Sequence, residues 1–414
     1  MRSSYKKIGD YITLVNKRNT DSIVRDLLGI NIDKFFMPSV ANTVGTDMSK
    51  YKVVKNGQFA CNRMHVGRDK RLPVALWRGD NDIIVSPAYD VFEIKDLESL
   101  NPEYLMMWFL REEFDRNAWF HTDADVRGGL TWESFCNMEI FVPCIEKQKQ
   151  IVEEYKILYL DNVKINNQLT HGLEDTMQAM YKQWFIEFEF PDENGMPYKE
   201  NGGELKFNDK LEKDIPINWK SGTLDEIAEI IDGDRGKNYP KQEDMKQNGF
   251  CLFLNTGNLT RNGFKFSKTT FITKEKDEAL RKGKLVRNDV IITSRGTVGN
   301  VAYYSDIIPY NNIRINSGML ILRGYDNAIF IYSLLKNKEM KREMENFLSG
   351  SAQPQLPIKD LIKIPIIIPQ IEVLEKFYRR VINIQRQIDR LLIQNLKLEE
   401  IKKILLSKMV SKEG

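Results

Sequence analysis

The sequence is poor in the residues that build metal sites, disulfide frameworks and membrane spans. Its four cysteines are scattered along 414 residues without a Cys-x-x-Cys pair, so neither a zinc ribbon nor a disulfide scaffold is indicated. None of the three histidines stands at metal-ligand spacing from a cysteine or carboxylate. No apolar run approaches the roughly 20 residues that a bilayer requires, and residues 1–10 lack the apolar core of a signal peptide. We therefore expect a cytoplasmic protein without a metal site or membrane association.

The chain also has little excess of charge of either sign. Sixty-one Lys and Arg residues against 58 Asp and Glu leave a net charge of +3, so any basic surface must be local. What the chain does contain is apolar material, because 42% of its residues are hydrophobic and 10% are aromatic. That composition is sufficient for sizeable cores. At roughly 100–200 residues per domain, the length predicts two or three domains.

Three segments of the first half recur in the same order in the second half. The matched pairs are 7–12 with 223–228, 54–67 with 286–299, and 130–143 with 356–369. The offsets are 224 − 8 = 216, 286 − 54 = 232 and 369 − 143 = 226. Three ordered matches with drifting offsets indicate two homologous units whose interiors differ in length.

Each repeat ends in a proline followed by a long helical pattern. After Pro369, apolar residues keep a heptad register, and they are Leu374, Val381 and Ile388 at one position and Phe377, Ile384, Leu391, Leu398 and Leu405 at the other. After Pro143, the predicted stripe is Ile151, Tyr155, Leu158, Ile165 and Leu169. This register favours pairing of the two helices, although each helix packed on its own domain is an alternative. Asn162 and Asn395 fall within the stripes, where a polar group commonly fixes register.

The remaining segments mix strand-like and helical patterns. Asp82–Val85 and Val290–Thr293 predict strands, and Pro102–Arg116 and Asn327–Phe347 predict helices. We therefore expect an α/β (α+β) domain that occurs twice. The Pro-, Asn- and Gly-rich stretch between them predicts a linker.

No segment carries a convincing catalytic pattern. Asn101-Pro102-Glu103-Tyr104 approaches the Asn-Pro-Pro-Tyr motif of amino-group DNA methyltransferases, but Glu stands where that motif has Pro. A helix N-terminus explains these residues. Gly-Thr-Val-Gly at 296–299 lacks the Lys-Ser/Thr of a phosphate-binding loop. We expect no catalytic residue and no cofactor site in this chain.

Local charge is the more informative signal. Residues 50–71 contain seven Lys and Arg against one acid, and residues 274–295 contain seven against four. Basic clusters at the same point of both repeats, mixed with Asn, Ser, Thr and Gly, are what contacts to phosphates and base edges require. The alternative is an ordinary solvated loop.

Three motifs together identify a resemblance to a known family. Residues 182–198 and 202–204 are similar to the central conserved region of the specificity (S) subunits of Type I restriction–modification systems. Residues 349–356 (Ser-Gly-Ser-Ala-Gln-Pro-Gln-Leu) look like the motif before that family's distal helix, and 294–299 (Ser-Arg-Gly-Thr-Val-Gly) resemble its common strand-turn. The resemblance extends over essentially the whole chain. The first repeat departs from it at 62–67 and at 126–130, which puts transfer of DNA contacts between the halves in doubt.

The resemblance implies a non-catalytic, bacterial DNA-binding subunit. Two target-recognition domains (1–143 and 215–369) would each read one half of a two-part target in double-stranded DNA. A central conserved helix (144–190), a linker (191–214) and a distal conserved helix (370–414) would form an antiparallel coiled coil that sets the gap. Two methylation subunits, which would bind S-adenosylmethionine, and motor-nuclease restriction subunits would be the partners. A methyltransferase with fused recognition domains and a coiled-coil scaffold are the alternatives.

Two sets of residues are predicted to make these contacts. Basic and amide side chains in the two repeats would contact DNA, and they are Arg63, His65, Arg68, Arg127, Arg235, Lys237, Asn255, Arg261, Arg295, Thr297, Gln353 and Gln355. Side chains expected on an exposed flank of the first long helix would dock the methylation subunits, and they are Tyr159, Met177, Tyr181 and Trp184.

Overall fold

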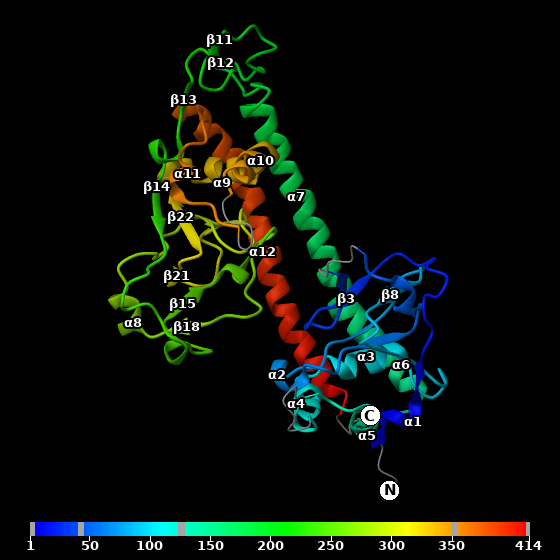
Figure 1. The fold of residues 1–414 in the computed structure, drawn as a ribbon. Helices are drawn as coiled ribbons and strands as arrows, with labels where there is room; N and C mark the ends of the chain where they lie inside the picture. Colours follow the sequence, from blue (N-terminus) through cyan, green and yellow to red (C-terminus); the bar gives the residue numbers. More distant parts are fainter. Residues whose placement is uncertain (1–4, 40–44, 123–128, 349–353, 411–414) are drawn as a thin grey trace. The chain divides into compact units, whose positions relative to one another are not determined.

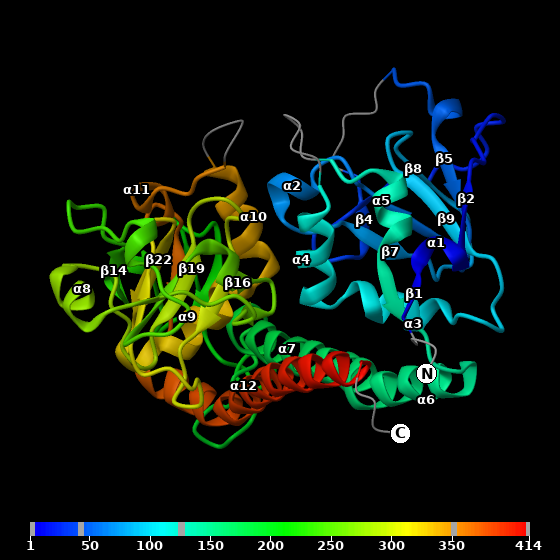
Figure 2. The ribbon, with the colours of Figure 1, turned by 90° about the horizontal axis from the view of Figure 1, so that it is seen from below.

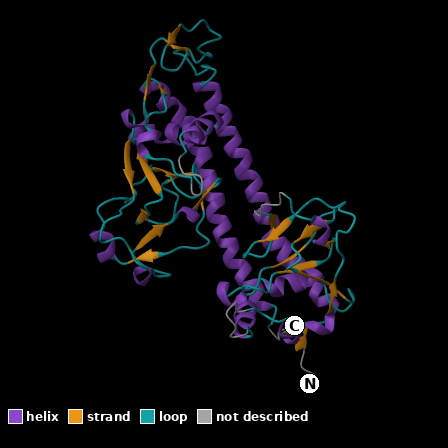
Figure 3. Cartoon of the chain, viewed as in Figure 1, coloured by secondary structure: helices purple, strands orange, loops and turns teal. Residues whose placement is uncertain are grey.

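The computed structural model describes residues 5–39, 45–122, 129–348 and 354–410. Residue contacts divide the chain into a first unit (residues 1–162 and 398–414) and a second unit (residues 163–397). Both boundaries fall inside helices, so the chain passes from one unit to the other in helical conformation. Figures 1 and 3 show the helices and strands of both units.

The first unit combines short strands with helices of one to three turns. Its strands are β1 (Tyr5–Lys7), β2 (Ile12–Val15), β3 (Leu28–Ile30), β4 (Phe36–Pro38), β5 (Lys52–Val54), β6 (Phe59–Cys61), β7 (Val74–Leu76), β8 (Ile83–Val85), β9 (Asp90–Ile94) and β10 (Glu139–Phe141). Its helices are α1 (Ile8–Tyr11), η1 (Met48–Lys50), α2 (Val66–Asp69), α3 (Pro102–Phe109), α4 (Glu112–Phe120), α5 (Trp132–Asn137), α6 (Ile145–Tyr155) and the π-helical η2 (Lys156–Asp161), together with the last turns of α12 (Ile371–Lys408).

The second unit has the same mixture. Its strands are β11 (Leu205–Asn208), β12 (Lys213–Pro216), β13 (Lys220–Gly222), β14 (Glu229–Asp232), β15 (Cys251–Leu254), β16 (Leu259–Thr260), β17 (Gly263–Phe264), β18 (Phe271–Ile272), β19 (Val290–Thr293), β20 (Val301–Tyr303), β21 (Ile313–Ile315), β22 (Met319–Arg323) and β23 (Ile366–Ile368). Its helices are α7 (Asn162–Phe185), η3 (Leu224–Glu226), η4 (Gln242–Asp244), η5 (Thr256–Asn258), α8 (Lys274–Ala279), η6 (Tyr325–Asn327), α9 (Ala328–Lys336), α10 (Lys338–Asn346), α11 (Ile358–Leu361) and most of α12.

One antiparallel sheet topology is built twice. The four-stranded sheet of the first unit has the order β2-β9-β6-β7, and that of the second has β14-β22-β19-β20. In each unit a separate antiparallel pair joins an early strand to the last one, β1 with β10 and β13 with β23. The predicted internal repeat and the mixed α+β class are therefore confirmed. The strands predicted around 82–85 and 290–293 are also confirmed, as β8 and β19.

Alternate side chains of the central strand β19 serve two cores. Val290 and Ile292 pack in a cluster that includes the apolar residues of α9, which contacts β19, β20 and β22 (Figure 2). Ile291 packs on the opposite side with Leu252 of β15 and Ile313 of β21. Because successive side chains of a strand point to opposite faces, a strand buried on both faces needs a continuous apolar run. The sequence Val-Ile-Ile-Thr of β19 meets this requirement.

Both helices predicted in the globular parts are interrupted. The predicted helix 102–116 consists of α3 and α4, separated at Arg111, whose backbone is extended. The predicted helix 327–347 consists of α9 and α10, separated at Asn337 (φ −66, ψ 145). The side-chain oxygen of Asn337 accepts the N–H of Glu339 at 2.9 Å and so caps a new helix. The prediction of one continuous helix was therefore wrong at both places. At Asn337 the cap competes with helix continuation, whereas the break at Arg111 has no side-chain cap.

In the second unit, α7 and α12 pack against each other as antiparallel helices. The rings of Trp184 and Phe377 lie 5.6 Å apart, while Asn166 donates to Asn395 at 2.8 Å, so rising residue numbers on one helix meet falling numbers on the other. The predicted stripe of the distal helix is buried or half-buried throughout. Asn395 pairs with Asn166 and Asn167. Asn162 instead bonds the carbonyl of Ile157 in its own helix.

The stripe predicted for the first long helix is wrong from Leu158 onward. Leu158, Ile165 and Leu169 are 43%, 51% and 52% exposed. The buried row lies one residue later along the helix, and its members are Tyr159, Asn166, Thr170, Met177, Tyr181 and Trp184. Two rows with heptad spacing thus lie about 100° apart on the same helix. The row that carries the large aromatic side chains is buried, since these remove the most apolar surface from water.

The first long helix ends earlier than predicted, at Phe185 rather than near residue 190. Phe188 follows with a φ of +63, and Phe190 stacks on Tyr198 and Trp219 with ring centroids 4.6 and 4.9 Å away. Residues 191–214 are not a plain linker, because they contain β11 and the start of β12, which pair as a hairpin. The aromatic stack ties this segment to the core of the second unit.

Candidate nucleic-acid interface

Several strand ends of the second unit meet at one edge. Strand β22 begins beside the ends of β14 and β19, as the pairs Asp232–Leu320 and Thr293–Met319 show. Strands β15 and β21 are parallel, and the segment 316–318 connects the end of β21 to the start of β22. The segments that follow β14, β15 and β19 therefore begin at the same edge. We call it the strand-end edge.

Arg295 lies on the turn between β19 and β20 at this edge. Its backbone N–H donates to the carbonyl of Gly318 at 3.2 Å. Gly296 has a φ of +70, a conformation that favours glycine and turns the chain sharply. The Thr293 hydroxyl donates to the carbonyl of Thr297 and closes the turn. The backbone of the turn is thus fixed, and the side chains of Arg295 and Thr297 are exposed.

The segment before α11 adds Gln355 to the same edge. Arg295 and Gln355 form an isolated antiparallel bridge, and the N–H of Leu356 donates to the carbonyl of Ser294 at 2.9 Å. Gln355 is half-buried. The structure therefore brings Gln355 beside Arg295, although the two are 60 residues apart. Gln353, which was predicted with them, lies outside the described residues.

Asn255 follows β15 and lies near these residues. Its side-chain oxygen accepts the N–H of Gly257 at 2.9 Å, which caps η5, and its side chain is exposed. Thr256 packs close to Gly318, because a Cβ atom added to that glycine would lie 2.8 Å from the Thr256 methyl and 3.7 Å from the Cβ of Arg295. Gly318 thus allows the Asn255 and Arg295 segments to approach each other.

Arg235 and Lys237 leave the end of β14 at the same edge. A guanidinium N–H of Arg235 donates to the carbonyl of Ser317 at 3.3 Å. Between the two basic residues and β14 lies Asp234, which is buried. The N–H groups of Gly236 and Arg281 hold the pKa of the Asp234 carboxyl below its usual range. Ionised Asp234 therefore fixes the backbone from which Arg235 and Lys237 project.

Arg261 is the remaining predicted DNA contact of the second unit. It lies in the turn between β16 and β17. Burial and the charges of Lys336 and Arg261 together lower the pKa of Lys341 on α10. The carbonyl of Leu259 in β16 accepts the side-chain amide of Asn300, which precedes β20, at 3.0 Å, so the β16–β17 hairpin is also joined to the β19–β20 connection.

The strand-end edge presents the donors and acceptors that nucleic-acid recognition uses. Arg295 offers a planar fork of N–H donors, Asn255 and Gln355 offer amides, and Thr297 offers a hydroxyl. Such groups match the hydrogen-bonding patterns of base edges in the major groove. No group of three or more His, Cys, Asp and Glu side chains that could hold a metal occurs among the described residues.

Comparison with known proteins also indicates DNA recognition by this part of the chain. A family model described as the Type I restriction modification DNA specificity domain matches residues 216–404, a range that includes the strand-end edge. This part of the chain, residues 216–404, is a Type I specificity domain. The resemblance inferred from the sequence motifs is therefore confirmed.

Relatives of the specificity domain align over most of the chain. The chain is 29% identical over 308 residues to the Type I restriction enzyme MjaIX specificity subunit of Methanocaldococcus jannaschii, covering 69% of this chain but only 64% of that protein. It is 23% identical to the HindI specificity subunit of Haemophilus influenzae, with 98% of each covered. A crystal structure of a Type I S subunit from M. genitalium matches 99% of this chain and 96% of its own, with 14% identity and a TM-score of 0.48.

In the first unit, Arg63 occupies the place in the repeat that Arg295 has in the specificity domain, but the surroundings of its side chain differ. Arg63 is only 19% exposed, and its Nε donates to Asp90 at 2.7 Å. A second guanidinium N–H donates to the carbonyl of Leu130, and the charge lies 5.6 Å from the Trp132 ring. Arg63 therefore joins the start of β9 to the segment before α5. The DNA contact of Arg63 stays a prediction, and in this structure its side chain is held by Asp90 rather than exposed like that of Arg295.

The remaining predicted contacts of the first unit are less constrained. His65 precedes α2 and is half-buried, and Arg68 on α2 is 69% exposed while it pairs with Asp69 at 2.7 Å. Arg127 lies outside the described residues. None of these residues is joined to Arg63 by a described hydrogen bond. The ends of β2 and β6 nevertheless meet the start of β9 in the first unit, as the pairs Val15–Val91 and Cys61–Asp90 show.

The predicted partner-binding residues do not form an exposed flank. Tyr159, Met177, Tyr181 and Trp184 are at most 7% exposed. Burial raises the pKa of the Tyr181 hydroxyl above its ordinary value, and that ring lies 6.0 Å from Phe330 of α9. These side chains are buried because they form the seam and core beneath the helix, so the prediction of an exposed docking surface at them was wrong.

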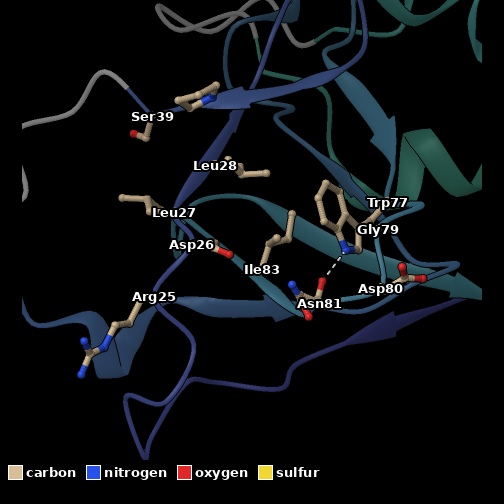
Figure 4. Close-up of a pocket in the computed structure, with 11 residues that line it drawn as sticks. Arg25, Asp26, Leu27, Leu28, Ser39, Trp77, Gly79, Asp80, Asn81 and Ile83 are labelled. Atoms are coloured by element: carbon tan, nitrogen blue, oxygen red, sulfur yellow. Dashed lines mark hydrogen bonds between the residues drawn. The ribbon is translucent and has the colours of Figure 1, made fainter.

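An open pocket of about 690 Å³ lies in the first unit (Figure 4). Trp77, Arg25 and Asp26 are among the residues that line it, and the Trp77 indole N–H donates to the carbonyl of Asn81 at 2.8 Å. Trp77 follows the end of β7, whereas Arg63 follows the end of its antiparallel partner β6. The pocket is therefore at the opposite end of the sheet from Arg63.

Sequence reasoning missed two contributors to the strand-end edge. Asp234 and Gly318 position the residues named above, yet neither belongs to a recognisable motif. A carboxylate two residues after a strand and directly before a basic residue is the only sequence signal for Asp234. Gly318 gave no signal, because its role depends on the approach of segments more than 20 residues away.

Proposed function

We propose that this chain is the DNA sequence-specificity subunit of a Type I restriction–modification complex, in which the second unit reads one half of a two-part DNA target. The observation that supports this most directly is the strand-end edge of the specificity domain. Its exposed Arg, Asn and Thr side chains stand on fixed backbone turns. Rigid placement of this kind is what discrimination between bases requires.

Substitution of Arg295 tests this proposal. We expect Arg295→Ala to lower affinity for the target by about 1–3 kcal/mol, because one bidentate base contact is worth that much. Arg295→Lys keeps the charge but loses the fork, so it should retain binding to unrelated DNA and lose discrimination. Mapping methylated adenines across the genome of cells that carry each variant shows which half of the motif has changed.

The matched control is Arg379→Ala, which removes an exposed arginine from α12. It should leave the motif unchanged. Altered base preference in both halves of the target after Arg295→Ala would contradict the assignment of separate halves to separate units.

In this proposal the chain is non-catalytic. S-adenosylmethionine would bind the methylation subunits, which transfer the methyl group, and motor-nuclease subunits would complete the restriction complex. Ultraviolet crosslinking to labelled S-adenosylmethionine should therefore label a methylation subunit. Labelling of this chain itself would favour a methyltransferase with fused recognition domains.

We further propose that the methylation subunits dock on the exposed apolar row of the first long helix. In the second unit this row contains Ile165 and Leu169, which are 51% and 52% exposed. Apolar side chains in one row of a helix are the usual anchors of a helix-binding partner. This row replaces the buried residues that the sequence had suggested.

A charged substitution in this row is expected to abolish capture of a methylation subunit. Ile165→Asp combined with Leu169→Asp places two charges in the contact, so capture in a pull-down should fall at least tenfold. Gln168→Asp adds a charge to a polar, exposed position of the same turn and should have little effect. Equal capture by all variants would exclude this row as the docking surface.

A further inference from the structure

Two neighbouring loops of the second unit carry four exposed cations. The first loop, residues 233–238, contains Arg235 and Lys237, and the second, residues 279–284, contains Arg281 and Lys282. The side chains of Arg281 and Lys282 are 79% and 63% exposed. We call these two segments the basic double loop.

Side-chain bonds join the two loops. The carboxylate of Asp234 accepts the N–H of Gly236 at 2.6 Å within its own loop and the N–H of Arg281 at 2.8 Å from the other. The side-chain amide of Asn238 donates to the carbonyl of Ala279 at 3.0 Å. The two loops are therefore held together by hydrogen bonds between side chains of the first loop and backbone groups of the second.

Glycines let the two backbones touch. Gly283 has a φ of +82, and a Cβ atom added to it would lie 3.2 Å from the Cα of Gly233. A Cβ atom on Gly233 would lie only 2.1 Å from the carbonyl oxygen of Asn316. The loops 279–284, 233–238 and 316–318 are thus layered backbone against backbone. In the loop 316–318, the carbonyl of Gly318 accepts the hydrogen bond from the backbone N–H of Arg295.

A buried ion pair supports the second loop from below. Arg314 is 7% exposed, and its Nη1 donates to the carbonyl of Lys282 at 2.7 Å. Its Nε donates to Asp277 at 2.6 Å. The backbone of Lys282 is therefore held from the inside while the lysine side chain extends outward.

The four cationic side chains of the basic double loop are exposed to solvent and have few acidic partners in the chain. Lys282 pairs with Asp232 at 3.3 Å, and Arg281 lies 4.0 Å from Asp234. The Asp234 carboxylate already accepts two backbone N–H groups. Four cations against these two carboxylates leave a net positive ridge on rigid backbone.

We propose that the basic double loop binds phosphates of the DNA backbone beside the bases that the strand-end edge reads. This inference rests on the proposed function. Lysine ammonium groups are point charges that suit phosphates, and phosphate contacts fix register without reading sequence. The ridge continues into the strand-end edge through the Arg235–Ser317 bond.

Salt dependence of binding tests this proposal. The full chain with its methylation subunits, carrying Lys237→Ala and Arg281→Ala, is titrated with duplexes of target and scrambled sequence at several salt concentrations. Each lost phosphate contact lowers the slope of log affinity against log salt by about 0.9, so the double variant should lose about 1.8. Affinity for both duplexes should fall by the same factor, and base preference should not change.

The control is the double variant Lys206→Ala and Lys210→Ala, which removes two exposed lysines from the β11–β12 hairpin region. It should keep the wild-type slope. A wild-type slope in the Lys237/Arg281 variant would overturn this proposal, and so would a fall confined to the target duplex. If wild-type protein itself failed to prefer the target, the proposed function would be contradicted instead. A wild-type slope together with loss of a protein partner would assign the ridge to an acidic protein surface.

Discussion

The Asp277→Ala variant is expected to lose about 3–5 kcal/mol of unfolding free energy, the usual effect of removing one partner of a buried charge pair. Asp277 is 4% exposed and accepts from Arg314 at 2.6 Å and from Lys284. Arg314 is buried as well, so alanine at 277 leaves a guanidinium without its carboxylate. Urea denaturation of the purified chain, followed by tryptophan fluorescence, measures the change.

The effect of Asp277 should depend on pH in a defined direction. Burial by itself raises the pKa of the carboxyl, but the hydrogen bonds from Lys284 and Arg314 outweigh it and leave the pKa below its ordinary value. A depressed pKa in the folded state contributes stability above the pKa of the unfolded chain, and this contribution is lost as pH falls through the folded value. The difference between wild type and Asp277→Ala should therefore shrink in acid.

Asp326→Ala is the control, because this exposed carboxylate lies in η6 of the same unit. Its unfolding free energy should stay within about 0.5 kcal/mol of wild type, as for most surface substitutions. A loss below about 1 kcal/mol in Asp277→Ala would mean that water or another group compensates Arg314. The loop that carries Lys282 would then not depend on this ion pair.

The repeat and the strands could be predicted because they depend on local patterns. Val-Ile-Ile-Thr at 290–293 is an apolar run too short for a helix, and it forms the central strand β19. The similar turns that follow β6 and β19 pointed to the same place in each unit. Placement of Arg295 and Thr297 at one strand end followed from this pattern, and the structure adds Asn255 and Gln355 to the same edge.

The errors arose where two local patterns compete or where distant segments decide. Leu169 and Thr170 lie in adjacent rows of one helix, and hydropathy selected Leu169. The core instead buries the Thr170 row, because that row also carries Trp184. Arg63 and Arg295 occupy matching places in the repeat, but Asp90 lies within reach of Arg63 and holds it inside the first unit. Asp90 is distant from Arg63 in the sequence, so the residues around Arg63 do not indicate this ion pair.

Lengthening both helical passages between the units is expected to widen the gap in the DNA target. The chain passes between the units inside α7 at 162/163 and inside α12 at 397/398. Four helix-forming residues inserted at both points leave the Asn166–Asn395 pair within the second unit and the Tyr159–Glu399 pair within the first. The bases read in each half should stay the same, because no recognition residue moves within its own unit.

The expected size of the change follows from helix geometry. Four residues lengthen an α-helix by about 6 Å at 1.5 Å per residue, and B-DNA rises about 3.4 Å per base pair. The unspecified gap should therefore grow by one or two base pairs, as read from the methylated motif in cells that carry the variant. Four residues rotate the helix by about 40° beyond a full turn, whereas two rotate it by about 200°. The two-residue insertion should consequently abolish methylation, because each helix would turn its apolar seam away from its partner. Full activity of the four-residue variant with an unchanged gap would show that the helices do not set the spacing between the half-sites.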